Sequence, residues 1–133
     1  RIESRGLGDV YKRQIYELKK NQKISSEDIF KLAENGEDIA IEIIEDLINR
    51  IAILLSQLTL TYLPGKGIFL AGSMMRSLIK FIDKNKFKKQ YLANIGSPQL
   101  EILKATQINV VTKENLALYG CLNYFNSIQK DLN

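Results

Sequence analysis

The sequence contains no histidine and only one cysteine, Cys121. Without histidine the chain lacks the commonest general base and the commonest metal ligand of proteins, so histidine-dependent triads and zinc sites are excluded. One cysteine can form neither an internal disulfide nor a cysteine-cluster zinc site. We therefore expect no metal site made by this chain. Low cysteine usage is typical of a reducing compartment, and it favours a cytoplasmic location.

The chain also lacks a long uninterrupted apolar run and a strong excess of one charge. Its most apolar stretch, residues 51–62, is broken by polar residues and is shorter than the ~20 residues of a spanning helix. The formal net charge is only +4, and residues 1–14 contribute +2 of it. The other lysines are scattered among acidic residues, which is not typical of a nucleic-acid-binding surface. We expect neither a membrane nor a nucleic acid as partner.

The first fourteen residues differ in character from the rest. Residues 1–14 (RIESRGLGDVYKRQ) show no helical or strand periodicity, and the chain does not begin with methionine. The string resembles the translated read-through of a sequencing adapter. We expect this segment to be non-native and place the domain in residues 15–133. The alternative is a native polar arm with a Gly6-x-Gly8 turn, which alone is a weak phosphate-loop signal.

Apolar spacing in residues 15–133 alternates between helical and strand-like. A helix end is expected at 15–21, and Ser25 or Ser26 caps a second helix that stops at Asn35-Gly36. A long amphipathic helix follows from about residue 37 to Pro64-Gly65, and its second half is apolar nearly all round, which predicts deep burial. The later expected elements are a buried strand at 67–72, helices at 74–83, 87–94 and 113–129, and a strand at 108–111.

Two shorter segments lie between the helix expected at 87–94 and the strand expected at 108–111. Residues 96–98 read as a turn, and residues 99–105 are too short to assign. Thr112 is the expected cap of the last helix. The order of helices and strands predicts an α/β fold in which helices cover a sheet.

Three stretches together resemble bacterial glucokinases. Residues 26–40 (SEDIFKLAENGEDIA) are similar to the family pattern S-x-E-D-I … A-x-x-G-D-x-x-A. Residues 58–73 (LTLTYLPGKGIFLAGS) are similar to N-L-A-L … G-G-V-F-I-A-G-G, and residues 115–121 (NLALYGC) to the closing P-G-L-L-G-A-A helix. Their order and spacing also match, so the resemblance covers nearly all of residues 15–133.

This resemblance implies the C-terminal part of an actin-like (ribonuclease H-like) kinase domain, with helices packed on a partial sheet. It implies an enzyme that phosphorylates glucose to glucose 6-phosphate with ATP and Mg²⁺. Gly72, Ser73 and Met74 match the family's adenosine-contacting turn and are the candidate cofactor-binding residues. The family's catalytic aspartate, phosphate-binding strand and E-P-G-H sugar segment lie in its N-terminal half. We expect no catalytic residue here, and an inactive fragment.

Other interpretations stay open. From the residues alone, the Gly72 turn can be a tight strand-to-helix junction that binds nothing. Ser73 stands where the family has a second glycine, and its side chain either crowds the adenosine or donates a new hydrogen bond. The alternative functions are another actin-like sugar or amino-sugar kinase, a related sugar-sensing repressor, or a non-catalytic α/β interaction module. Glucose and ATP are the expected partners, and a homodimer remains open.

Overall fold

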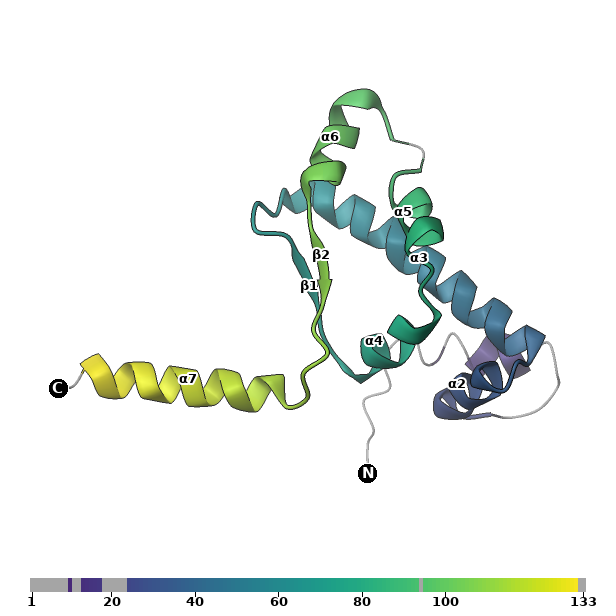
Figure 1. The fold of residues 1–133 in the computed structure, drawn as a ribbon, viewed down its shortest axis with the longest axis horizontal. Helices are drawn as coiled ribbons and strands as arrows, with labels where there is room; N and C mark the ends of the chain where they lie inside the picture. The colour runs from purple at the N-terminus through teal and green to yellow at the C-terminus, as the bar shows by residue number, and fades with distance from the viewer. Residues whose placement is uncertain (1–9, 11–12, 18–23, 94, 132–133) are drawn as a thin grey trace.

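The structure is a computed structural model that describes residues 10, 13–17, 24–93 and 95–131. Its elements run in the order α2 (Ser26–Glu34), α3 (Asp38–Tyr62), β1 (Ile68–Leu70), α4 (Ser73–Leu78), the 3₁₀ helix η1 (Ile79–Phe81), α5 (Lys84–Tyr91), α6 (Ser97–Ala105), β2 (Ile108–Val110) and α7 (Leu116–Asp131). Helices dominate, and β1 pairs with β2 in a two-stranded parallel sheet (Figure 1). This arrangement is compatible with the predicted α/β class. Most of the segment predicted to be non-native, residues 1–14, lies outside the described residues.

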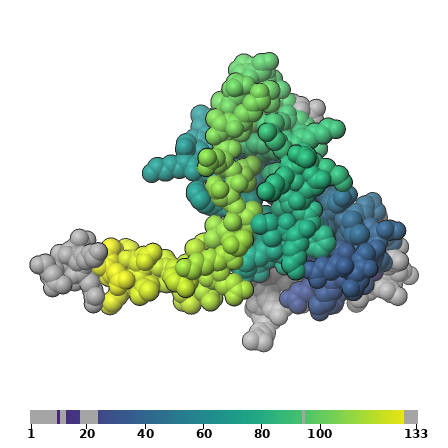
Figure 2. Space-filling view, in the orientation of Figure 1, coloured from purple at the N-terminus to yellow at the C-terminus, as the bar shows by residue number. Residues whose placement is uncertain are grey.

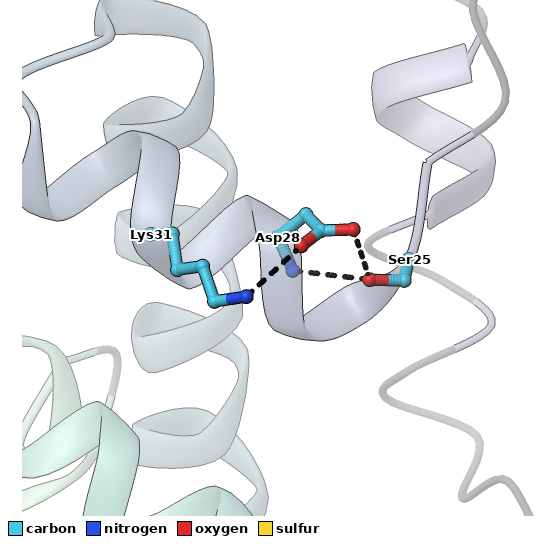
Figure 3. Close-up of polar contacts among 3 residues, drawn as sticks. All are labelled: Ser25, Asp28 and Lys31. Carbon is cyan, nitrogen blue, oxygen red and sulfur yellow. Dashed lines mark hydrogen bonds and ion pairs between the residues drawn. The ribbon is translucent and has the colours of Figure 1, made fainter.

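Helix α2 begins at the predicted cap. The Ser25 hydroxyl oxygen accepts the N–H of Asp28 at 3.1 Å and donates to an Asp28 carboxylate oxygen at 2.5 Å. Lys31 Nζ donates to the other carboxylate oxygen at 3.3 Å (Figure 3). These bonds, chiefly the one from the Ser25 hydroxyl, hold the pKa of Asp28 below its ordinary value. The helix ends at Asn35, where Gly36 adopts φ +85° in the predicted stop.

Helix α3 is the long diagonal element in Figure 1, and two hydrophobic clusters lie along it. Its first half packs on α2 and α4 through the buried residues Ala40, Ile43, Ile44, Leu47 and Ile48. Its second half packs on α5, α6 and the sheet through Ala52 and Leu55. The predicted deep burial of this second half is wrong, because Ile53, Leu54 and Leu58 remain exposed on its other face. Among the described residues, no helix has the length and apolar character to cross a bilayer.

Three predicted boundaries shift for local reasons. The helix expected at 74–83 changes to 3₁₀ geometry at η1, and α5 starts earlier than expected because Asp83 caps it. The Asp83 carboxylate accepts the N–H groups of Lys86 and Asn85, and these bonds lower its pKa. The 96–98 turn is instead the start of α6, since Pro98 fits the first turn of a helix.

Helix α7 begins at Leu116 rather than Lys113, so Thr112 is not its cap. Asn115 adopts the left-handed conformation at φ +55°, and its carbonyl accepts the Leu118 N–H at 2.9 Å. The helix projects away from the rest of the molecule (Figure 1), and Leu118, Leu122 and Phe125 are exposed on it. Residues 115–129 contain no charged side chain. A helix of this composition is unusual on a solvated surface.

The two strands meet at a close backbone approach. Ile68 pairs with Ile108 in the parallel register, and the Ile68 N–H donates to the Gln107 carbonyl at 2.8 Å. Gly67 precedes this bond with φ +85°. A Cβ on Gly67 would lie 2.7 Å from the Gln107 carbonyl oxygen, closer than real Cβ contacts come. Glycine is therefore required at the entry to β1.

A buried pair of hydroxyls joins α3 to α5. Thr59 Oγ1 donates to the Leu55 carbonyl at 2.7 Å and lies 2.9 Å from the Tyr91 hydroxyl. Because the single Thr59 proton is used in the first bond, Tyr91 must donate in the second. Thr59 is 0% exposed and Tyr91 is 5% exposed. The second core cluster therefore contains a polar link whose groups are satisfied by one another.

We expect Tyr91→Phe to lower the free energy of unfolding by about 1 kcal/mol, since it removes one buried hydrogen bond without changing packing. Chemical denaturation monitored by circular dichroism measures the change. Tyr62→Phe is the matched control, because Tyr62 is 74% exposed on the end of the same helix α3. Equal effects of both substitutions would contradict the role of the Thr59–Tyr91 bond.

We expect Gly67→Ala to destabilise the fold by more than about 1 kcal/mol, because the new Cβ meets the Gln107 backbone at a positive φ. Gly65→Ala is the control, since a Cβ there would meet nothing within 4 Å. It should change stability by less than about 0.5 kcal/mol. Thermal melting of both variants measures the change in stability. A Gly67→Ala variant as stable as the original chain would disprove the close approach.

Candidate functional site

The candidate site is the turn that joins β1 to α4. Gly72 is the N-cap of α4 and adopts φ +121° with ψ 163°, a conformation that favours glycine. Its carbonyl accepts the Arg76 N–H at 3.2 Å, which closes the first helical turn. No side-chain hydrogen bond caps the helix at this residue. The first backbone N–H groups of α4 therefore point out of the helix end without an intrahelical acceptor.

The space beside this turn is open. A Cβ built on Gly72 would meet no described atom within 4 Å, and both Gly72 and Ser73 are exposed. Met74 differs, because its side chain is half-buried and packs on the first core cluster. The structure thus brings Gly72 and Ser73 to one accessible surface. Met74 can offer that surface only its backbone amide.

Carboxylates of α2 and α3 form ion pairs with lysine and arginine side chains. Glu45 binds Lys86 at 3.2 Å, and the Glu34 carboxylate binds Lys80 at 2.7 Å. Asp46 pairs with Arg50 one helical turn away at 2.9 Å. No group of three or more acidic or cysteine side chains in the described part of the chain is placed to hold a metal ion. The acids of α3 are explained by ion pairs and solvation rather than by acid–base chemistry.

One feature near the turn was not predicted from the sequence. A cavity of about 400 Å³ is bounded by the sheet, α4, α5 and α6, and all its lining residues fall within residues 70–110. Its apolar lining residues are interspersed with lysines along the chain, so no sequence motif identifies it. Residues of both strands line the cavity, so its wall forms only when β1 and β2 are paired.

Comparison with known proteins gives one match. The family model described as Glucokinase matches residues 3–128 of the 133-residue chain. The match includes residues 3–14, so the non-native origin of that segment stays a prediction. No curated protein sequence and no solved structure gives a significant match to the chain. Because the family model covers nearly the whole sequence, this chain belongs to the glucokinase family.

Proposed function

We propose that this chain forms part of a kinase that transfers the γ-phosphoryl group of ATP to the 6-hydroxyl of glucose, with Mg²⁺ as cofactor. The family match over residues 3–128 supports a sugar kinase. We assign to this chain the adenosine-binding side of the enzyme, at Gly72, Ser73 and Met74. Glucose and ATP are its proposed partners and the cytoplasm its proposed location.

The observation that carries this proposal is the geometry of Gly72. A backbone with φ +121° and open space on the Cβ side allows a flat ligand to approach the chain closely. The N–H groups at the start of α4 and the positive end of its dipole favour electronegative ligand atoms. The Ser73 hydroxyl is exposed beside them, where it can donate a hydrogen bond or narrow the approach.

The phosphoryl transfer itself requires more than this turn. It needs a base beside the sugar hydroxyl, ligands for Mg²⁺ and loops that hold the phosphates. The carboxylates of α3 that are described above form ion pairs with Lys86 and Arg50. We therefore propose that the chain by itself binds the nucleoside part of ATP and does not phosphorylate glucose.

We expect Gly72→Ala to weaken ATP binding about tenfold, because the added methyl group occupies the approach to the backbone. Isothermal titration calorimetry with the full chain measures the dissociation constant. Gly36→Ala is the matched control, since Gly36 also has a positive φ (+85°) and open space within 4 Å. Gly36→Ala also places a Cβ at a positive φ and should leave ATP affinity unchanged.

Ser73→Gly completes the test by restoring the glycine of the family pattern. A change of ATP affinity in either direction places the hydroxyl beside the nucleotide. Unchanged affinity in both Ser73→Gly and Gly72→Ala would refute the assignment of this turn, although the family membership would stand.

A further inference from the structure

The cavity bounded by β1, β2, α4, α5 and α6 has the size of a small-molecule site. Its volume is about 400 Å³, within the range of typical ligand pockets. Leu70, Ile108 and Val110 of the strands form one wall, and Ile79 and Phe87 face it from the helical segment. Figure 2 shows a furrow on this face, between the column of α6 and β2 and the column of α4 and α5. The cavity is therefore an apolar groove with an opening to solvent.

The charged residues that line this groove in the described part of the chain are all lysines. Lys84, Lys88 and Lys104 line it together with the apolar residues, and none of the described acidic side chains does so. Lys84 and Lys88 are one turn apart on α5, so they lie on the same side of that helix. Their exposed side chains can place alkyl stems along the apolar wall and ammonium groups at the opening.

These two lysines also differ from several others in the chain. Lys31, Lys80, Lys86 and Lys104 each pair with a carboxylate at 3.3 Å or less. Within the described residues, neither Lys84 nor Lys88 forms an ion pair. In the part of the chain that the structure describes, two cations without a counter-ion thus border one apolar groove.

The interior of the groove offers little to a polar ligand. Its neutral polar side chains are Thr106 and Tyr91. Thr106 Oγ1 donates to the Ile102 carbonyl at 2.9 Å, and the Tyr91 hydroxyl is bound to Thr59. A sugar or nucleobase would therefore lose hydrogen bonds to water on entering, whereas a hydrocarbon would not. The apolar lining therefore favours a ligand with an apolar body, and the lysines at the opening favour a ligand with an anionic head group.

We propose that this groove binds an amphipathic monoanion of the medium-chain fatty acid class. The alkyl chain lies against Leu70, Ile108 and Val110, and the carboxylate lies between the ammonium groups of Lys84 and Lys88. This site is separate from the Gly72 turn and does not depend on the proposed kinase activity. Hydrophobic burial supplies affinity, and the two lysines supply the preference for an anion over a neutral ligand.

The test compares octanoate with octan-1-ol, which has the same chain length and no charge. Titration of the full chain by calorimetry gives affinities, and methyl NMR reports which side chains respond. We expect octanoate to bind more tightly and to shift the methyl signals of Leu70, Ile108 and Val110. Lys84→Gln/Lys88→Gln should weaken octanoate binding about tenfold and leave octan-1-ol unchanged.

A second double variant controls for net charge. Lys66→Gln/Lys89→Gln removes the same two charges, one of them from α5, but neither residue lines the groove. It should change octanoate affinity by less than about twofold. Val110→Phe partly fills the groove and should weaken both ligands.

Three results would overturn the proposal. One is octan-1-ol binding as tightly as octanoate. The groove would then have no preference for an anion and would suit a neutral ligand or an apolar side chain of another protein. Another is an equal loss of octanoate binding in both double variants, which would indicate general electrostatic attraction only. The third is the absence of methyl shifts at the strand residues.

Discussion

Burial of one face of α3 is the interaction on which the rest of the structure depends. The helix contributes residues to both core clusters, and each neighbouring element is held by its contact with that face. Helix α2 rests on the first half, while α5 and α6 rest on the second half and carry the sheet with them. Leu78 and Leu103, both essentially unexposed, anchor α4 and α6 to this arrangement. The Gly72 turn is positioned because its strand and its helix are each packed against α3.

The sheet itself is small, and none of the described elements covers its outward side at Phe69. Phe69 is 63% exposed between two strand neighbours that face the core. Parallel sheets are normally covered on both faces, and a two-stranded one has little independent stability. The exposed side of α3 and the part of α7 without charged residues, 116–129, add further apolar surface. Figure 1 shows α7 extended from the body formed by the other described elements.

Sequence was most informative where a local signal decides the structure. A cap at Ser25 or Ser26, a stop at Asn35-Gly36 and a strand before Gly72 were predicted, because capping groups and glycine act within a few residues. The strand is not buried as predicted, since Phe69 is 63% exposed. The burial of the second half of α3 was mispredicted, since composition cannot tell which apolar face has a neighbour. Pro98 was read as a turn residue although the first helical turn also accepts it. The groove was missed because it depends on the pairing of distant strands.

That pairing also has a consequence for how the molecule folds. Ile68 and Ile108 close a long loop, and the entropy lost in closing it is recovered only after α4, α5 and α6 have packed. We expect the strand pair to form late and to open early in local unfolding. Because Leu70, Ile108 and Val110 form one wall of the groove, such an opening would remove that wall. A molecule bound in the groove would stabilise the pairing of two strands that are distant in the sequence.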